Sequence, residues 1–405
     1  MKNNILKTLL LLIAFLTVAK FADADWQSTL ATHFDHVDTF DNLADWTGSQ
    51  YNGEFASGPP GASMLKGYSF WDPSPPTTTW ISNFGAGTNI TGKSIVVDMN
   101  DTYGPNRLHF YFGDGTSSSG YDDLYHFYRV KFLPGLFISP TQRSQGYYWG
   151  YFKWGELCQG FVGPTNWGDA IDRTKVIQGV KACQNDHVLH NYGPSFALLT
   201  FAYYGALTNI FNSSPAVGTI RSCDTPLLNG STETTGIQMS SIIGPNDYLR
   251  DNDRPEGNGT FDFYNYENRW LGIEAHASLG PDSGDANHSR YGDLEYWVYD
   301  ETGNVLNHWK VLSDGVITSY ISNLAGQRIP SQTFYPNQKY NKVTIGGNIQ
   351  LINGSGQQIG GNTSGKTYID DVIVHGSRIG PTYYLLLNGT ADTTPPAAPR
   401  GLSIK

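Results

Sequence analysis

The stretch from Asn268 to Asp300 constrains the fold most, because it reads as two β-strands joined by a long polar loop. In the first strand one alternating set is Leu271, Ile273, Ala275 and Ala277 and the other is Gly272, Glu274, His276 and Ser278. In the second strand the sets are Leu294, Tyr296 and Val298, and Glu295, Trp297 and Tyr299. Residues that alternate along a strand lie on opposite faces of a sheet. The sequence therefore predicts one apolar core face and one wet face with acidic and aromatic side chains.

The wet face of this strand pair is a candidate ligand surface. We expect Trp297, Glu295 and Tyr299 to bind a ligand there, and we take His276 and Glu274 as candidate catalytic groups. The aromatic rings could stack on a flat ligand while the polar groups bind its hydroxyls. An ordinary solvent-facing sheet with scattered aromatic residues would show the same pattern.

Composition favours an all-β chain. The 46 Gly, 25 Tyr and 20 Phe among 405 residues are typical of short strands and turns. The net charge of −10 repels nucleic acid and anionic membranes, so neither is an expected partner. The same charge would also repel an acidic polymer at long range. A basic groove would have to overcome this repulsion locally.

The N-terminus reads as a secretory signal peptide over residues 1–24. Lys2 and Lys7 precede an apolar run from Leu9 to Ala19, and Ala22-Asp23-Ala24 offers the small residues that signal peptidase requires. The run is shorter than the roughly 20 apolar residues of a membrane span, and no later stretch is long enough. We therefore expect an extracellular protein that begins at Asp25 and does not insert into a membrane.

Three cysteines suit an oxidising compartment in which two of them pair. They are Cys158, Cys183 and Cys223, and the sequence does not choose among the three possible disulfides. A reactive thiol is the alternative. We expect a main domain over residues 25–390, interrupted at about 157–247 by a disulfide-containing loop insertion of the kind that often walls a binding cleft.

Further candidate site residues lie on strands before this insertion. Arg107 and His109 share one face of a strand predicted over 107–112, and we take both as catalytic candidates. Lys153 lies in the aromatic-rich segment GYYWGYFKWGELCQGF and is a candidate for substrate binding. Ion pairs on a solvated sheet would also account for these residue types.

The tail over 391–405 is a proline-rich linker followed by the first residues of a strand. Its Pro-Pro-Ala-Ala-Pro-Arg-Gly-Leu run resembles the opening of a fibronectin type III module. The resemblance implies that further modules follow toward the C-terminus.

Several motifs together resemble the concanavalin A-like jelly-roll proteins of the secreted polysaccharide lyase and LamG-like superfamily. They are the Phe-Asp-x-x-x-x-Phe-Asp pattern that begins at Phe34, Trp270 to Glu274, Leu294 to Val298 and the closing Tyr368 to Pro381. The resemblance implies two curved antiparallel sheets, an all-β jelly-roll sandwich, with a polysaccharide lying across the concave sheet. It covers lyases, glycoside hydrolases and non-catalytic binding modules, so fold does not decide among them.

One shorter segment is similar to a strand of jelly-roll alginate lyases. Tyr151-Phe-Lys-Trp-Gly155-x-x-x-Gln159 follows the pattern of that strand, but Leu157 stands where those enzymes carry a catalytic tyrosine. The companion Gln-Ile-His and Arg-Thr-Glu-x-Arg patterns are missing from the sequence. The segment therefore does not assign an activity.

Two chemistries suit the candidate residues. Elimination from a uronic acid needs a cation or amide at the carboxylate, a base for the C5 proton and an acid for the leaving oxygen. Hydrolysis needs two carboxylates beside the bond, such as Glu274 and Glu295. We expect a lyase-like protein acting on a polysaccharide that could contain uronate, with a glycoside hydrolase less favoured and a binding or adhesive module as the alternative.

A structural calcium ion is a further expectation. In jelly rolls the last strand runs beside the first, which would bring Asp371 close to Asp35. Carboxylates grouped with backbone carbonyls suit Ca²⁺. An Asp371 that only caps a turn is the alternative.

Overall fold

The computed structural model describes most of the sheet framework of the chain. It describes residues 26–41, 61–69, 81–85, 91–98, 107–137, 148–160, 174–181, 200–203, 236–238, 263–286, 288–317, 337–346, 349–353, 357–359 and 366–389, and positions 43, 139, 141, 142, 145, 328, 331 and 355. The signal peptide and the proline-rich tail that the sequence predicts lie outside the described residues. So do Cys183 and Cys223, whereas Cys158 is a buried thiol, so the disulfide stays a prediction.

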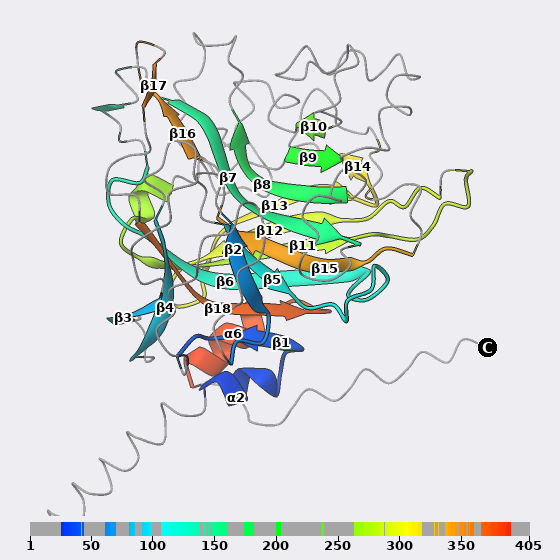
Figure 1. The fold of residues 1–405 in the computed structure, drawn as a ribbon, viewed down its shortest axis with the longest axis horizontal. Coiled ribbons are helices and arrows are strands. Elements are labelled where there is room, and N and C mark those ends of the chain that lie inside the picture. The colour runs from blue at the N-terminus through cyan, green and yellow to red at the C-terminus, as the bar shows by residue number, and fades with distance from the viewer. Residues whose placement is uncertain are drawn as a thin grey trace, which may run out of the picture.

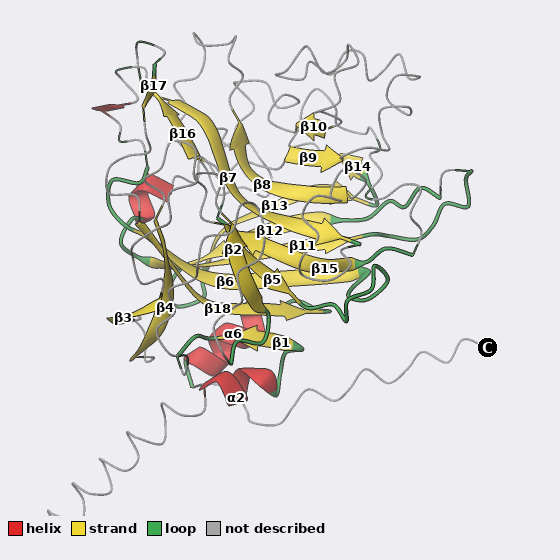
Figure 2. Ribbon diagram, viewed as in Figure 1, coloured by secondary structure: helices red, strands yellow, loops and turns green. Residues whose placement is uncertain are grey.

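The described strands form two antiparallel sheets, as the sequence predicted (Figures 1 and 2). The first sheet has the order β14-β13-β12-β11-β6-β18-β4-β3, and β1 pairs with β18 beside this path. Its strands are β1 (His36–Asp38), β3 (Ile81–Gly85), β4 (Thr91–Asp98), β6 (Asp123–Phe132), β11 (Trp270–Ser278), β12 (Leu294–Tyr299), β13 (Val305–Ser313), β14 (Val316–Ile317) and β18 (Lys366–His375). The first strand therefore does run beside the last.

The second sheet has the order β10-β9-β8-β7-β15-β5-β2, and β16 pairs with both β7 and β17. Its strands are β2 (Leu65–Ser69), β5 (Arg107–Tyr111), β7 (Tyr148–Gln159), β8 (Thr174–Lys181), β9 (Thr200–Tyr203), β10 (Gly236–Gln238), β15 (Tyr340–Ile345), β16 (Ile349–Ile352) and β17 (Gln358–Ile359). Within the predicted loop insertion, residues 174–181 form strand β8. Its run of Val176, Ile177 and Val180 is rich in β-branched side chains, which suit a strand.

The apolar faces of the two sheets form the core of the sandwich. On the first sheet this face carries Leu271, Ile273 and Val130, and on the second it carries Phe110 and Val343, all 0% exposed. Strand register agrees with this division, because Ile273 lies opposite Val298, and Val343 opposite Phe110 and Leu157. Each sheet therefore also has an outer face, turned away from the core.

Asp38 joins the two sheets at the edge of the core. Its carboxylate accepts hydrogen bonds from the backbone N–H groups of Ser63 at 2.5 Å and of Met64 and Leu65 at 2.8 Å. Asp38 belongs to β1 of the first sheet, whereas Leu65 begins β2 of the second. The three bonds satisfy backbone donors that a buried strand end would otherwise leave unpaired.

Two short helices cover part of the outer face of the first sheet. They are α2 (Trp26–Ala31) and α6 (Gly380–Leu387), which come from opposite ends of the described chain and lie side by side (Figure 1). Pro381 at the start of α6 suits the first helical turn, where the missing N–H group costs no hydrogen bond. A 3₁₀ turn, η4 (Phe263–Tyr266), precedes β11. Among the described residues no helix is long and apolar enough to cross a membrane.

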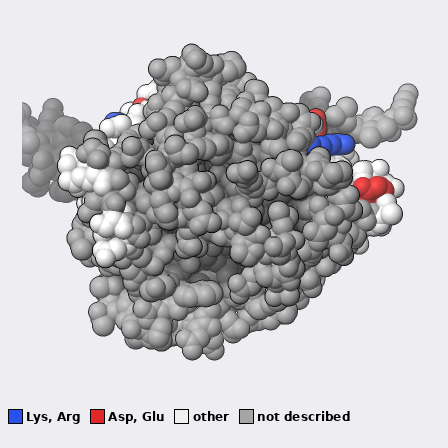
Figure 3. Space-filling model, turned by 90° about the horizontal axis from the view of Figure 1, so that it is seen from above, with Lys and Arg blue, Asp and Glu red and all other residues white. Residues whose placement is uncertain are grey.

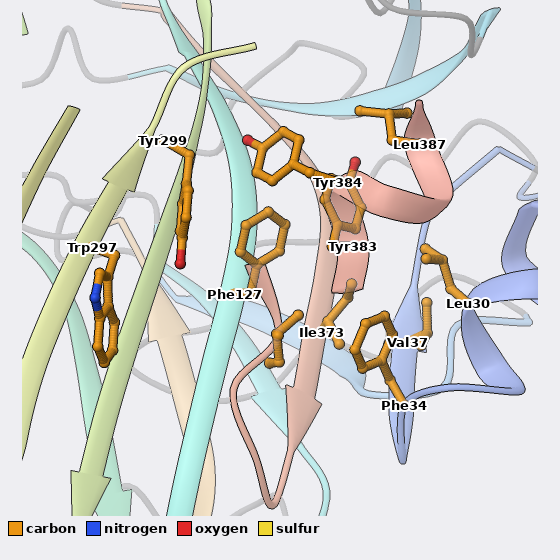
Figure 4. Packing of buried hydrophobic residues seen from close by; sticks show 11 residues of the cluster. Leu30, Phe34, Val37, Phe127, Trp297, Tyr299, Ile373, Tyr383, Tyr384 and Leu387 are labelled. Atoms are coloured by element: carbon orange, nitrogen blue, oxygen red, sulfur yellow. The ribbon is translucent and has the colours of Figure 1, made fainter. Parts of the chain in front are cut away.

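The helices make the prediction of a wet face on β11 wrong. Every residue of β11 except Ser278 is buried, on both faces of the strand. Tyr383 and Tyr384 of α6 pack with Phe127, Tyr299 and neighbouring side chains in one apolar cluster (Figure 4). The alternating pattern was interpreted correctly as a strand, but alternation alone does not show that a helix from elsewhere in the chain covers the polar side.

Candidate functional site

The predicted site residues lie on the outer faces of two different sheets. Glu274, His276, Glu295, Trp297 and Tyr299 share the outer face of the first sheet, because Glu274 lies opposite Trp297 and His276 opposite Glu295. Arg107, His109 and Lys153 belong to β5 and β7 of the second sheet. A two-sheet sandwich separates these faces by its core. The four catalytic candidates therefore cannot act in one site.

Glu274 is a buried anchor for helix α6. Its carboxylate is 0% exposed and accepts hydrogen bonds from the Tyr299 hydroxyl at 2.5 Å and from the N–H groups of Ile379 and Gly380 at 2.6 and 3.2 Å. Burial raises the pKa of Glu274, although these donors and Arg378 oppose the rise. Because the donors come from the helix start and the neighbouring strand, the geometry is that of a structural carboxylate and gives no support to a catalytic role.

Trp297 is enclosed by its neighbours. It is 5% exposed, its ring lies parallel to that of His308 at 4.9 Å, and the Arg378 guanidinium carbon lies 4.4 Å from its centroid. Tyr299 is 1% exposed. The expectation that these two rings form an open platform is therefore wrong, because a sugar ring needs a free aromatic face on which to stack.

His276 and Glu295 have close polar partners on the same face. His276 Nε2 lies 2.5 Å from Asp123 Oδ1, and its ring stacks on Tyr125 at 4.2 Å. Glu295 lies 3.3 Å from His308 Nε2 and 3.2 Å from Lys310 Nζ. Burial raises the pKa of Glu295, but these two cationic or donor partners outweigh it, so that the pKa lies below its usual value. Because His276 and Glu295 are paired in this way, they stabilise the surface of the first sheet.

The outer face of the second sheet gathers polar residues of another kind. Arg107, His109 and Tyr111 alternate along β5, and His109 lies opposite Thr344 while Tyr111 lies opposite Lys342. Lys342 also lies opposite Cys158 of β7. His109 and Lys342 are both 0% exposed and Thr344 is 1% exposed. A cation and an imidazole are thus held inside the protein on adjacent strands.

Sequence reasoning missed Lys342. The sequence predicts a strand from Lys342 to Ile349, in which Lys342 and Thr344 alternate with Val343 and Ile345. That pattern predicts that Lys342 faces away from the core. It does not predict burial, and lysine is rarely fully buried unless it is paired.

Lys153, the other candidate that the sequence placed in this region, belongs to β7 and lies opposite Gly179 of β8 in the same sheet.

The predicted calcium ligands do not form a metal site in the geometry. Asp371 accepts hydrogen bonds from Trp26 Nε1 at 3.1 Å and from the Tyr383 hydroxyl. Asp35 Oδ2 accepts from the Tyr121 hydroxyl at 2.9 Å and lies 2.7 Å from His375 Nδ1. In the part of the chain that the structure describes, no three His, Cys, Asp or Glu side chains converge as metal ligands. Asp371 and Asp35 therefore do not fit Ca²⁺ as this geometry holds them.

Comparisons with known proteins assign no family. No protein-family model matches the chain, and no curated protein matches it either. Similar solved structures include the marine PL-14 alginate lyase from Aplysia kurodai, at 9% identity and a TM-score of 0.29, with 73% of this chain and 86% of that chain covered.

Two toxin domains are also among the similar structures. The binding domain of Paraclostridial Mosquitocidal Protein 1 has 8% identity and a TM-score of 0.29, with 76% of this chain and 45% of that chain covered. The Botulinum neurotoxin serotype G binding domain has 10% identity and a TM-score of 0.27, with 81% and 48% covered. The chain thus spans less than half of either toxin domain. TM-scores this low transfer no function to it.

Proposed function

We propose that the protein acts on an extracellular polysaccharide at the outer face of the second sheet, by lyase-like elimination. The observation that carries the proposal is the pair of fully buried polar side chains, His109 and Lys342, on adjacent strands of that face. A solvated sheet surface would leave a lysine exposed. A cation and an imidazole kept away from water are what a site for charged-group chemistry requires.

The residues of this face match the parts of an elimination reaction. Lys342 would neutralise the carboxylate of a uronic acid and so acidify its C5 proton. His109 would take that proton as general base, and the Tyr111 hydroxyl would protonate the leaving oxygen. Residues directly opposite in an antiparallel ladder lie about 5 Å apart and diagonal neighbours about 7–8 Å, a spacing that suits contact with one sugar ring.

The net charge of the chain implies that cations at the site, and not the protein as a whole, attract an acidic polysaccharide. With a net charge of −10, the protein as a whole repels an acidic polymer. Attraction must then come from cations at the site. From above, the described Lys, Arg, Asp and Glu side chains that are visible lie at the rim of the molecule (Figure 3).

Glycoside hydrolysis by Glu274 and Glu295 is less well supported. The two carboxylates are diagonal in the ladder between β11 and β12, because Glu274 lies opposite Trp297 and Glu295 opposite His276. The Glu274 carboxylate already accepts hydrogen bonds from the Tyr299 hydroxyl and from the N–H groups of Ile379 and Gly380, which hold the start of α6. We therefore place the reaction on the other sheet.

The test is incubation with alginate, pectate, glucuronan and heparan-type chains. Elimination creates a double bond, so absorbance near the unsaturated-uronate band should rise with the unaltered protein and be lost in Lys342→Met and in His109→Gln. The matched controls are Lys310→Met and His276→Gln on the first sheet, which should keep the activity. Circular dichroism melts must show that each variant is folded.

The other outcomes separate the alternatives. Reducing ends without the new absorbance would mean hydrolysis. No product from any polymer, together with retardation in a polysaccharide gel that Lys342→Met abolishes, would mean a binding module that uses the same face. Absence of both product and retardation would refute the proposal.

A further inference from the structure

A buried acid pair lies where both terminal helices meet the last strand. Asp370 and Asp371 are adjacent in β18 and are 4% and 2% exposed. Strand β18 has an irregular register between Asp370 and Ile373, and Asp371 has a φ of 46°. This left-handed conformation is uncommon for a residue other than glycine, so the surrounding contacts must hold it in place.

Asp371 binds one residue from each helix. Trp26 Nε1 of α2 donates to Oδ1 at 3.1 Å, and the Tyr383 hydroxyl of α6 donates to Oδ2. The Trp26 and Tyr383 rings also meet edge to face, with centroids 5.9 Å apart. One carboxylate therefore ties the two ends of the described chain to the same strand.

Few charges oppose the pair. Arg129 of β6, 2% exposed, lies opposite Asp370 in the ladder and is the cation near both acids. Asp41, which follows β1, adds a further negative charge near Asp370. From α6 the groups that face the pair are the Tyr383 and Tyr384 hydroxyls, and from α2 the uncharged indole of Trp26. With both acids ionised, two adjacent negative charges would face one buried cation.

We propose that Asp370 and Asp371 form a proton-dependent clasp, which holds α2 and α6 on the sheet while the pair keeps one proton and loosens when that proton leaves. The clasp is separate from the proposed polysaccharide site, which lies on the other sheet. Its release would uncover the outer face of the first sheet, where Phe127 and Tyr299 are now packed beneath α6 (Figure 4).

The direction of the pH effect follows from linkage. Burial first, and then the charges of Asp371 and Asp41, raise the pKa of Asp370 well above its usual value. A carboxyl group with a raised folded-state pKa favours the closed state below the open-state pKa of about 3.9, and this contribution is lost as pH rises toward the folded-state pKa. The opening equilibrium of the helices should therefore increase by up to tenfold per pH unit within that window and then level off.

Amide hydrogen exchange of the full chain measures this opening. The reporting amides are Phe34, Tyr383 and Asn388, which bond to the carbonyls of Leu30, Ile379 and Tyr384 at 3.0, 2.9 and 3.0 Å. After correction for intrinsic exchange, their opening should increase from pH 5 upward in the unaltered protein. In Asp370→Asn, which cannot ionise, the rise should shrink to the part that comes from Glu274, whose pKa burial also raises where it holds the start of α6.

Asp35→Asn is the matched control. Asp35 binds the end of β18 through His375, but hydrogen bonds lower its pKa, so its own effect on stability has the opposite sign. This variant should keep the rise in opening with pH. Opening in the unaltered protein that does not change with pH, or that changes equally in Asp370→Asn, would overturn the clasp. If Asp370→Asn does not fold, two other measurements still decide the question. Opening in the unaltered protein must increase with pH, and Tyr383→Phe, which lacks the hydroxyl that donates to Asp371, should open more at every pH.

Discussion

The Tyr299 hydroxyl donates a 2.5 Å hydrogen bond to Glu274 Oε2, and both side chains are buried beneath helix α6. Both were candidates for a ligand surface on sequence grounds. In the structure they satisfy one another and hold the start of a helix instead. Burial first, and then the charge of Glu274, raise the pKa of Tyr299, so that the phenol stays protonated and can donate at neutral pH.

Loss of the Glu274 carboxylate should destabilise the protein. Glu274→Ala leaves the Tyr299 hydroxyl and the N–H groups of Ile379 and Gly380 without their acceptor. An unsatisfied buried polar group costs about 1–3 kcal/mol, so the variant should lose about 3 kcal/mol or more of unfolding free energy. Urea denaturation measures this loss.

Glu301→Ala is the control for this prediction. Glu301 pairs with Arg269 at 2.6 Å, but the two side chains are 35% and 45% exposed. Exposed ion pairs contribute about 0–1 kcal/mol, so the midpoint should hardly move. A Glu274→Ala variant that is as stable as the unaltered protein, but inactive on a polysaccharide, would contradict the structural role and return Glu274 to the catalytic candidates.

Trp297→Ala should also lower stability. Trp297 packs in the cluster that includes Phe127 and Tyr299, and it is 5% exposed. Truncation of a large core residue costs about 3–5 kcal/mol, which a thermal melt detects as a clear fall in melting temperature. Val305→Ala, at a side chain 46% exposed, should change the unfolding free energy by less than about 0.5 kcal/mol. An unchanged melt for Trp297→Ala with weaker polysaccharide retention would restore the original sequence interpretation.

Strand periodicity predicted the framework because sheet pairing follows a local signal. The alternation around Glu274 and Trp297 indicated both strands and their shared face, and the structure confirms that these residues lie opposite each other. The antiparallel two-sheet sandwich, which the resemblance to jelly-roll proteins implied, is likewise confirmed. The strands and their faces depend on residues within one or two strands.

The sequence pattern did not predict which elements cover the outer face of a sheet. Helix α6 contains Thr382-Tyr-Tyr-Leu-Leu-Leu387, which has no polar stripe to mark an amphipathic helix, and it packs on residues more than 80 positions earlier, such as Tyr299. The burial of Lys342 is equally a property of tertiary packing. The sequence shows which residue types lie on each face of a strand. Which face remains accessible depends on contacts between residues that are far apart in the chain.

Stability should depend on pH through Asp35. Burial raises the pKa of Asp35, but the hydrogen bond from Tyr121 and the contacts with His375 and Gly376 outweigh it and lower the pKa below its usual value. A lowered folded-state pKa stabilises the fold above the unfolded pKa of about 3.9, and the contribution is lost as pH falls through the folded value.

Asp35→Asn should therefore destabilise the protein at pH 7, and the difference from the unaltered protein should shrink as pH falls below about 3.9 and the carboxyl becomes protonated. Melting temperatures across this range test the prediction. Asp114→Asn serves as a comparison, because Asp114 lies in the exposed loop between β5 and β6 and bonds only within that loop among the contacts described. A loss for Asp35→Asn that is the same at every pH would show that the effect does not come from ionisation.

Calcium addition should leave the melting temperature unchanged. A Ca²⁺ ion takes six to eight oxygen ligands, whereas both oxygens of Asp371 already accept hydrogen bonds from Trp26 and Tyr383. An ion at this place would have to displace both donors and separate the two helices that they join. Calorimetric titration of chelator-treated protein should therefore give no heat of binding, and melts with calcium or with chelator should coincide. If calcium raises the melting temperature, Asp371→Asn shows where it binds: an effect lost in this variant would restore the calcium prediction at Asp371, and an effect that persists would place the ligands elsewhere in the chain.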